Sequence, residues 1–419
     1  MKILHVVQGY APSIGGSQWL TQQLAEHLVN RYGDQVTVFT TVADSLDLFH
    51  RRDVPALPAG VETIHGVTVR RFGVFNRLRF ARRALASLTY RLRLPYNDWF
   101  RTLESGPLTP GLRRAVAAAD ADVIFATAFP LCHMYDALHG GRRAGTPVVL
   151  LGALHTADAW GFDRPMIYRA IRRADAYLAH TAYERDYVVA RGADPARIRI
   201  VGAGVDLAEF ATADGHAIRA ALGWQDRPVV ATLSRFIARK RFDLLLDAMQ
   251  GVWQRHPDAC LLLAGARTPY LTHLEQTIRR LPQADQIAVF ADFPTAQKSS
   301  LLAAGDLFVS ASAEESFGIA FVEAWAAGVP VIGANEGAIP SVIDAGEDGL
   351  LFDYPDPASL AHAILTLLDD PARRRTMAAA GQQKVRDRYT WDAITAQVRA
   401  VYVDLLAQQK LESLKQSKA

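Results

Sequence analysis

The segment LFVSASAEESFGIAFVEAWAAG, residues 307–328, joins a predicted buried strand to a predicted buried helix. Leu307–Ala311 is a short apolar run typical of a buried strand, and Ser316–Gly328 consists almost entirely of apolar or small residues. Glu323 is the one charged residue inside this helix, and the burial of an unpaired carboxylate is costly. Because no Lys or Arg lies within one helical turn of Glu323, we expect its partner to come from elsewhere in the fold or from a ligand.

Glu315 precedes Glu323 by eight residues and stands where the chain leaves the predicted strand. The helix that begins between the two carboxylates offers unpaired N–H groups to an anion. Two carboxylates for hydroxyl groups and a helix terminus for phosphate suit a nucleotide-sugar. The alternative is that acidic residues near a helix start only interact favourably with its dipole, and we prefer that interpretation for Glu314.

Short apolar runs and longer helical patterns alternate along the whole chain, which indicates βαβ units and parallel sheets. The predicted strands of the first half are 3–8, 36–40, 123–127, 148–154, 174–180 and 198–201. Further strands are predicted at 228–233, 259–264, 287–290, 307–310 and 329–332. We therefore predict an α/β protein with Rossmann-like domains at 1–203 and 204–385. A C-terminal segment, 386–419, is expected to contain a long helix and a frayed polar end from 408 onward.

The composition supports two domains in a soluble globular protein. A chain of 419 residues is too long for one ordinary core, and its net charge of +3 says little about partners. Cys132 and Cys260 cannot form a disulfide framework and lie in no zinc-like spacing, which fits a reducing cytoplasm. The apolar run Met1–Val7 is too short for a signal peptide, and no stretch approaches the length of a membrane span.

Three further polar features follow predicted strands, where ligands of open parallel sheets bind. Gly15 and Gly16 would let the backbone approach a ligand closely, although an ordinary strand-to-helix turn would also explain them. His155 ends the apolar run 148–154, and the alternative for a lone histidine is a structural role in the core. Arg235 directly follows the strand 228–233, and Lys240 lies in a run of cations that would otherwise form a solvated surface.

These features together resemble a known family. Glu315 and Glu323 resemble the Glu-x7-Glu motif of retaining glycosyltransferases of family 4, which have the GT-B fold. Residues 234–241 look like the Gly-Arg-Leu…Lys-Gly motif of the same family, and the resemblance extends over the whole chain. It implies two Rossmann-like domains facing across a cleft, with a C-terminal helix that crosses back to the N-terminal domain.

The resemblance also implies roles for residues of the second domain. Arg235 and Lys240 would hold the diphosphate of the donor and stabilise the charge that develops on the leaving group. Glu315 would contact hydroxyl groups of the sugar, and Glu323 would contact the ribose diol. The backbone would meet phosphate or sugar at three further positions: Phe317, Gly318 and Ile319.

In the first domain, the resemblance implies that the Gly15–Gly16 loop approaches the phosphates and sugar of the donor. His155 matches the family's histidine, which would form a hydrogen bond with the transferred sugar. The resulting catalytic set is His155, Arg235, Lys240 and Glu315.

Four positions depart from the family pattern. Ser234 replaces the usual Gly before the Arg, and Arg241 replaces the Gly after the Lys. Arg267 takes the place of the second Gly in a Gly-x-Gly turn, and Asp292 takes the place of another expected Gly. The last two lie near the family's base-binding region, so they leave the identity of the base open.

The implied activity is transfer of a sugar, with retention, from a UDP- or GDP-linked donor to a hydroxyl acceptor, a lipid-linked glycan being one candidate. The donor is a substrate, and no cofactor, obligatory metal or nucleic-acid partner is expected. Asp120-Ala121-Asp122 matches the Asp-x-Asp motif that forms the metal site of another glycosyltransferase fold. It lies between a helical run and a buried strand, however, which indicates a turn.

Two other functions fit the same architecture. A nucleotide-sugar epimerase would isomerise the sugar without an acceptor, and a catalytically silent protein would only bind sugars or serve as a scaffold. The Arg/Lys motif together with Glu-x7-Glu favours transfer over both.

A basic insert at 70–101 contains nine arginines and one acidic residue, Asp98. Its apolar residues recur at helical spacing and form a stripe: Leu78, Ala81, Leu85, Leu88 and Leu92. Five arginines lie away from that stripe: Arg77, Arg82, Arg83, Arg91 and Arg93. The stripe could pack on the first domain, lie on an anionic membrane surface, or belong to a cationic acceptor site. Our hypothesis is peripheral attachment at the inner face of the membrane, which would bring the enzyme to a lipid-linked acceptor.

Overall fold

The computed structural model describes residues 1–13 and 15–416 and divides the chain into two compact units. Unit 1 comprises Met1–Gly202 together with the chain from Trp391 onward, and unit 2 comprises Ala203–Thr390. The boundary thus follows Gly202, whose φ of +63° lies in the region that glycine adopts most readily. Residues 386–390, which we assigned to the C-terminal segment, belong to unit 2.

In the described part of unit 1, eight strands form one sheet in the order β3-β4-β2-β1-β5-β6-β7-β8, all parallel except β3. The strands are β1 Lys2–Val6, β2 Gln35–Thr41, β3 Gly60–Ile64, β4 Val67–Phe72, β5 Val123–Thr127, β6 Val148–Leu151, β7 Ala176–Ala179 and β8 Ile198–Ile200. The helices are α1 Gly16–Tyr32, α2 Arg79–Arg91, α3 Asn97–Ser105, α4 Leu112–Ala117, α5 Cys132–Ala144, α6 Ala159–Phe162, α7 Pro165–Arg173, α8 Ala182–Val189 and α17 Trp391–Gln416.

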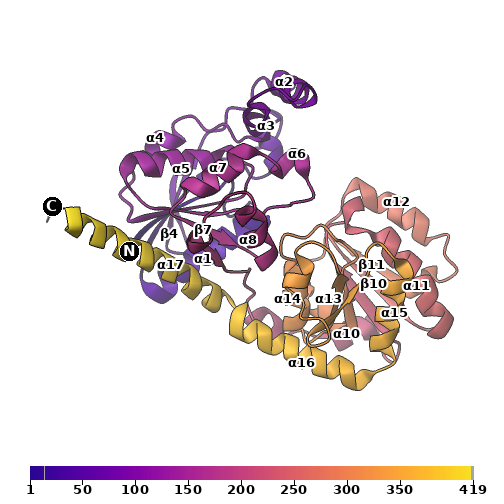
Figure 1. Cartoon of the computed structure of the whole chain (residues 1–419). Helices are drawn as coiled ribbons and strands as arrows, with labels where there is room; N and C mark the ends of the chain where they lie inside the picture. Colours follow the sequence, from indigo (N-terminus) through magenta and orange to yellow (C-terminus); the bar gives the residue numbers. More distant parts are fainter. Residues whose placement is uncertain (14, 417–419) are drawn as a thin grey trace. The chain divides into compact units, whose positions relative to one another are not determined.

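Helices cover the sheet of unit 1 (Figure 1). Side chains of β1, β5 and β6 form one core with α4, α5, α7 and α8, and α1 packs against α17 and β2. The antiparallel pair β3–β4 was not predicted. It occupies residues 60–72, so Arg70 and Arg71 belong to a strand and not to the helical insert. Arg71 is buried and donates its Nε–H to Glu62 Oε1 at 2.6 Å.

Unit 2 contains a second sheet, in the order β11-β10-β9-β12-β13-β14, and every strand pair in its described part is parallel. Its strands are β9 Val229–Leu233, β10 Cys260–Gly265, β11 Ile287–Ala291, β12 Leu307–Val309, β13 Val331–Ala334 and β14 Gly349–Phe352, of which β14 was not predicted. Its helices are α9 Ala208–Ala211, α10 Gly215–Leu222, α11 Phe242–Arg255, α12 Pro269–Ile278, α13 Lys298–Ala303, α14 Ile319–Ala326, α15 Pro357–Leu368 and α16 Pro371–Arg388.

Both faces of the unit 2 sheet are covered, as the alternation of side chains along its strands requires. Val230 and its neighbours on one face pack against α11, α12, α14 and α15. Val229 and Ala231 on the other face pack against α10 and α13. Two sheets of mainly parallel strands, each covered by helices, confirm the α/β class that the sequence predicts.

The last helix differs from the prediction at its C-terminal end. We expected a frayed end from residue 408, but α17 continues as a helix to Gln416. Its first half is fixed to unit 1: Arg399 Nε donates to the buried Asp34 Oδ2 at 2.8 Å, and Trp391 lies against His27. No helix within residues 1–13 or 15–416 has the length and apolar character needed to cross a membrane.

Candidate active site

The carboxyl ends of β9 and β12, two neighbouring strands of unit 2, bring two predicted residues into contact. Lys240 follows β9, at the end of the short 3-10 helix Ala238–Lys240, and Glu315 follows β12. Lys240 Nζ donates a hydrogen bond to Glu315 Oε1, and their side chains are only 15% and 14% exposed. Because neighbouring parallel strands end at the same edge of a sheet, residues 75 positions apart meet there.

Arg235 lies at the same strand end and remains exposed. The backbone around it is fixed: Ser234 N donates to Ala264 O at 2.9 Å, and Phe236 N donates to Ala266 O at 3.0 Å. Phe236 is fully buried. A Cβ atom at Gly265 would lie 1.6 Å from Ser234 O, so only glycine permits this close approach of the two strand ends. The loop therefore holds the backbone of Arg235 while leaving its guanidinium accessible to an anion.

Glu323 in α14 has a partner that the sequence analysis did not identify. Lys298 Nζ, at the start of α13, donates to Glu323 Oε1 at 2.8 Å and also lies 3.4 Å from Glu209 Oε2. Burial by itself would lower the pKa of Lys298, but the charges and hydrogen bonds of Glu323 and Glu209 outweigh it, so the pKa is raised. The expectation that the partner of Glu323 comes from elsewhere in the fold is thus met by Lys298, whose position before β12 gave no sequence signal.

The N-terminus of α14 lies between the two carboxylates in sequence. Gly318 precedes the helix with φ +86°, and a Cβ atom there would lie 2.6 Å from the ring of Phe321. The Phe317 side chain is buried and lies against Tyr389, with ring centroids 5.4 Å apart, whereas Ile319 is exposed. At Phe317, therefore, the side chain is not available to a ligand.

In unit 1, the Gly15–Gly16 loop leads into α1. A Cβ atom at Gly15 would lie 2.4 Å from Gln18 Oε1, whereas a Cβ atom at Gly16 would meet nothing within 4 Å. Gln8, at the end of β1, supports the loop by donating from Nε2 to Ser17 Oγ at 2.6 Å and to Gln18 Oε1 at 3.2 Å. Gly15 thus allows tight packing, and Gly16 leaves open space beside the helix start.

His155 lies in the loop that follows β6, half-buried beside Phe162, with ring centroids 5.3 Å apart. The strand ends at Leu151, three residues earlier than predicted, and the chain turns through Ala153 at φ +51°.

Glu184 in α8 holds this loop. Glu184 is 2% exposed and accepts hydrogen bonds from Leu154 N at 3.3 Å, Tyr177 Oη at 2.5 Å and His180 N at 2.8 Å. A Cβ atom at Gly152 would lie 1.8 Å from Tyr177 Oη, so the loop packs directly on this cluster. Sequence reasoning missed Glu184 because a single acidic residue near a helix start carries no distinctive signal.

Comparison with known proteins identifies the family. Residues 215–384 match the family described as glycosyl transferases group 1, and residues 14–209 match glycosyltransferase family 4. A GDP-mannose-dependent monoacylated alpha-(1-6)-phosphatidylinositol monomannoside mannosyltransferase of Corynebacterium glutamicum is 30% identical over 289 residues, which are 65% of this chain and 73% of the relative. This chain belongs to glycosyltransferase family 4.

Other similar proteins agree with this assignment. A D-inositol 3-phosphate glycosyltransferase of Segniliparus rotundus is 33% identical over 55% of this chain and 53% of the relative. Anabaena HepE in complex with UDP has the same fold, with a TM-score of 0.73 and 22% identity over 96% of this chain and 100% of HepE. The family 4 enzyme described here is therefore a glycosyltransferase with the GT-B fold, and the named relatives give no support to the epimerase alternative.

The structure also explains departures of this family 4 glycosyltransferase from the expected glycines. Arg241 and Asp292 both have positive φ angles, +51° and +53°, so each retains the backbone conformation that glycine adopts easily. Asp292 Oδ1 accepts a hydrogen bond from Arg267 N at 2.8 Å, so the two replaced positions near the expected base site bind each other.

Arg241 is half-buried, whereas a run of cations such as 239–241 was expected to form a solvated surface. It binds Asp243 and donates to Tyr354 Oη at 2.8 Å, and its hydrogen bond with Asp243 raises its pKa.

Asp120 and Asp122 lie in the turn before β5, where both bind Lys2. Asp122 Oδ2 accepts from Lys2 N at 2.7 Å, and Asp120 Oδ2 accepts from Lys2 Nζ at 2.5 Å. Both carboxylates therefore have a structural role at the amino end of β5, whereas the Gly15–Gly16 and His155 loops of the same unit follow the carboxyl ends of β1 and β6.

Proposed function

We propose that this chain transfers a sugar, with retention of anomeric configuration and without an obligatory metal, from a GDP- or UDP-linked donor to a hydroxyl group of an acceptor, a lipid-linked acceptor being one candidate. The observation that carries the proposal is the Lys240–Glu315 contact at the carboxyl ends of β9 and β12. It joins a cation suited to a diphosphate with a carboxylate suited to sugar hydroxyl groups.

Cleavage of the bond between the sugar and the diphosphate adds negative charge to the leaving group. Arg235 would bind phosphate oxygens with its planar fork, and Lys240 would act as a point charge. A lysine ammonium has three N–H donors, so Lys240 can bind phosphate while it remains on Glu315. Each well-aimed donor stabilises the developing charge by about 3–4 kcal/mol. These cations supply the electrostatic role that a metal ion has in other transferases.

The carboxylates would orient the donor. Glu315 would accept hydrogen bonds from hydroxyl groups of the sugar, and Glu323, held by Lys298, would accept them from the ribose diol. The half-buried His155 would bind the transferred sugar, and the open space beside Gly16 would admit the donor to the start of α1. Each of these contacts fixes the position of the anomeric carbon relative to the acceptor.

No side chain of the proposed set is assigned as a nucleophile. The acceptor hydroxyl would attack the anomeric carbon on the face from which the diphosphate departs. The bond from that carbon to the phosphate oxygen breaks, the bond to the acceptor oxygen forms, and the acceptor proton passes to the leaving phosphate. This sequence gives retention.

The relatives favour particular substrates. The Corynebacterium glutamicum relative is named for GDP-mannose and for a phosphatidylinositol mannoside, and the Segniliparus rotundus relative is named for inositol phosphate. We therefore propose a mannosyl or related hexosyl donor and an acceptor that contains an inositol phosphate or inositol lipid. Two free cysteines, Cys132 and Cys260, suit action in the reducing cytoplasm.

A thermal-shift screen with UDP, GDP, ADP and their sugars would identify the donor, and NMR of the reaction would test the chemistry. We expect one nucleotide-sugar to stabilise the protein, the product to keep the anomeric configuration of the donor, and turnover to persist in EDTA. Isomerisation of the donor without acceptor would contradict transfer. An inverted product would contradict retention, and activity lost in EDTA and restored by Mg²⁺ would contradict metal independence.

A further inference from the structure

The basic insert forms a pair of helices with an outward apolar surface. We call residues 78–105, which contain α2 and α3, the α2–α3 hairpin; its two helices pack against each other (Figure 1). The predicted stripe does not pack on unit 1, because Leu78, Leu85, Leu88 and Leu92 are 43–69% exposed. Ala86 and Thr89 are the buried positions of α2 instead. The interpretation in which the stripe packs on the first domain is therefore wrong.

Exposed apolar side chains are concentrated in this region. Ten of the eighteen exposed large hydrophobic side chains of the described chain lie between residues 75 and 99. They are Phe75, Leu78, Phe80, Leu85, Leu88, Tyr90, Leu92, Leu94, Tyr96 and Trp99. Phe80 is the most exposed of them at 84%, followed by Tyr96 at 73%. Isolated exposed apolar residues are normal, but a contiguous group marks a surface that meets another molecule or a membrane.

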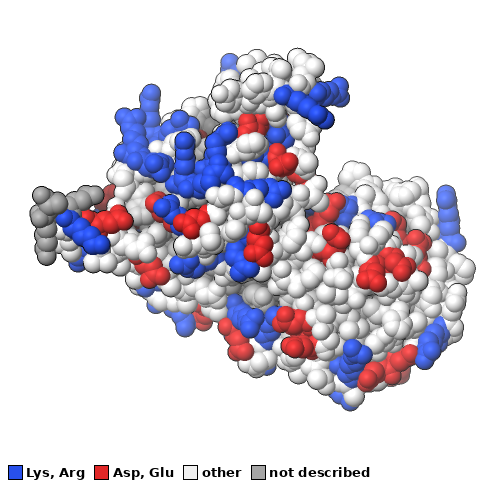
Figure 2. Space-filling model, viewed as in Figure 1, with Lys and Arg blue, Asp and Glu red and all other residues white. Residues whose placement is uncertain are grey.

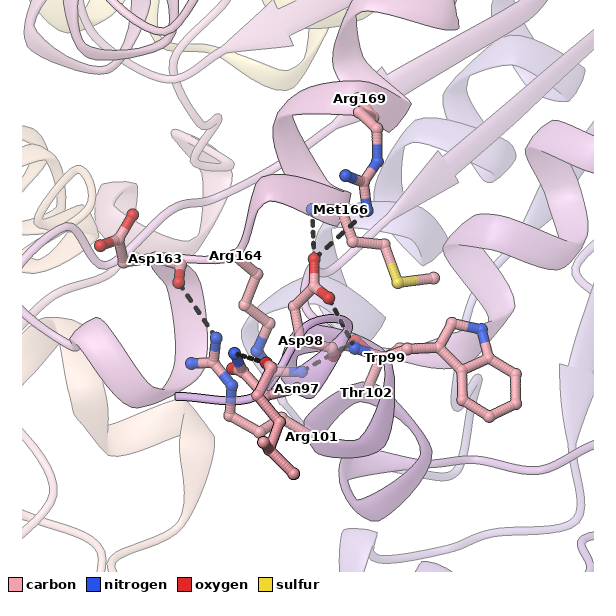
Figure 3. Close-up of polar contacts among 10 residues, drawn as sticks. Asn97, Asp98, Trp99, Arg101, Thr102, Asp163, Arg164, Met166 and Arg169 are labelled. Carbon is pink, nitrogen blue, oxygen red and sulfur yellow. Dashed lines mark hydrogen bonds and ion pairs between the residues drawn. The ribbon is translucent and has the colours of Figure 1, made fainter. Parts of the chain in front are cut away.

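The polar groups of α3 face inward and anchor the hairpin (Figure 3). Asp98 is 5% exposed and accepts hydrogen bonds from Met166 N at 2.8 Å and from Arg169 at 3.4 Å. Arg101, 3% exposed, donates to carbonyl oxygens of α6 and the following turn: Ala159, Trp160 and Asp163. The Trp99 ring points away from these contacts in Figure 3. The only acidic residue of the insert therefore contributes no charge to the outer surface.

A second anchor fixes α2. Arg82 donates from Nη1 to Leu103 O at 3.1 Å and from Nη2 to Phe49 O at 3.0 Å. These carbonyl contacts connect α2 both to α3 and to the body of unit 1. The hairpin is thus held by buried charges at its base, while its apolar side chains remain outside.

The remaining arginines give the outer surface a positive charge. Arg77, Arg83, Arg91 and Arg93 are exposed, and within the described residues none of them forms an ion pair. No Asp or Glu occurs from residue 77 to residue 97. Figure 2 accordingly shows white surface over the outermost part of the hairpin, with blue side chains beside it.

Three corners of the hairpin carry large side chains at positive φ: Leu78 at +62°, Arg93 at +50° and Tyr96 at +60°. Glycine would relieve the backbone strain at each of these positions. Apolar and cationic side chains nevertheless occupy the turns, two of which are among the most exposed apolar positions. The turn conformation alone therefore does not account for the apolar and cationic side chains at these corners.

We propose that the α2–α3 hairpin docks onto the surface of a bilayer that contains anionic lipids. Its aromatic and aliphatic side chains enter the headgroup region, and its arginines bind lipid phosphates. A second copy of this chain is a poorer occupant, because it would bring the arginines of two such surfaces together, and residues 77–97 contain no carboxylate to pair with them. The proposal does not depend on the glycosyl-transfer reaction, although docking would place the enzyme beside a lipid-linked acceptor.

Flotation of the full chain with vesicles tests the proposal. We expect binding to phosphatidylcholine vesicles that contain phosphatidylglycerol, weaker binding to phosphatidylcholine alone, and partial loss in high salt. Arg83→Gln/Arg91→Gln should weaken binding to anionic vesicles about 30-fold, as two surface cations predict. Phe80→Ser/Leu88→Ser should weaken binding at least tenfold at every salt concentration. Matched controls with exposed residues outside the hairpin, Arg114→Gln/Arg143→Gln and Leu411→Ser/Leu414→Ser, should bind like the wild type.

Insertion of the hairpin side chains into the bilayer can be measured separately. Brominated lipids should quench the emission of Trp99, and the Trp99→Phe variant should lose that quenching, whereas Trp19→Phe should retain it. Absence of vesicle binding at low salt would overturn the proposal, as would equal binding by the apolar variant and the wild type. A concentration-dependent dimer that Phe80→Ser/Leu88→Ser abolishes, without vesicle binding, would assign the surface to a second copy instead.

Discussion

The strand-end loops of unit 2 and the α2–α3 hairpin of unit 1 both carry clustered cations, but the two regions place them differently. At these loops and at the start of α13, Lys240 and Lys298 are largely buried and each is bound to a carboxylate. In the hairpin, Arg83 and Arg91 are exposed, and an exposed apolar residue lies within two positions of each in the sequence. Preorganised, paired cations suit recognition of one small anionic ligand, whereas exposed and flexible cations suit an extended anionic surface. The presence of clustered cations does not distinguish these two functions. The pairing and exposure of the cations do.

The largest expected effect comes from breaking the strand-end set. Arg235→Ala and Glu315→Ala should each lower kcat/KM by about 10²–10³-fold, because each removes an interaction with the charged or hydroxylated parts of the donor. Arg255→Ala, which removes a 65% exposed arginine from an ion pair with Asp369, is the matched control and should keep full activity. Near-normal turnover in both site variants would refute the site assignment.

A smaller loss is expected when the loop of His155 loses its support. Glu184→Gln keeps the shape of the side chain but removes the charge that Leu154, His180 and Tyr177 share. We expect kcat/KM to fall about tenfold through misplacement of His155, with a lower Tm. Glu412→Gln, on the exposed part of α17, serves as the control. A lower Tm with unchanged kcat/KM would show that Glu184 supports only the fold.

The Lys298–Glu323 pair predicts an effect on the binding of the donor. Lys298→Met leaves Glu323 partly buried without its partner, so donor KM should rise about tenfold with a smaller change in kcat. Lys298→Arg should restore much of the affinity. If the Met variant changed kcat and left the KM for the donor unaltered, Glu323 would not be positioned for donor binding.

The smallest effect concerns the attachment of α17. Burial would raise the pKa of Asp34, but its hydrogen bonds and charge interactions with Arg399 and with the N-terminal ammonium together outweigh burial, and the pKa is lowered. A lowered pKa in the folded state stabilises the protein above the unfolded pKa of about 3.9, and this contribution disappears as pH falls through the folded value. Asp34→Asn should therefore lower the apparent Tm at pH 7, and the difference from wild type should shrink below about pH 4. A difference that is constant with pH would contradict this role of the charge.

The main strands could be predicted because they depend on local patterns, whereas Lys240 and Glu315 were singled out by the resemblance to family 4, and the structure brings these two residues into contact. Apolar runs define β9 and β12, and parallel pairing then brings the residues that follow them together. Three strands, β3, β4 and β14, escaped prediction because their short, partly exposed runs resemble loops; β3 and β14 lie at sheet edges.

Residues that act through distant partners could not be found in this way. Lys298 and Glu184 acquire their roles only when α13 meets α14 and when α8 meets the loop after β6. The hairpin shows a further limit: helical spacing correctly located α2, but it could not indicate which face would pack. Arg82, placed on the solvated side, instead anchors the helix, and the leucine stripe is exposed.

The most direct test of the account is isothermal titration of the preferred nucleoside diphosphate into wild type, Arg235→Ala, Lys240→Met and the control Arg255→Ala. We predict that the dissociation constant rises at least tenfold in the first two variants, as loss of one charge-assisted contact requires, and stays unchanged in the control. Equal affinity in all four proteins would contradict the claim that the strand-end cations of unit 2 hold the donor diphosphate.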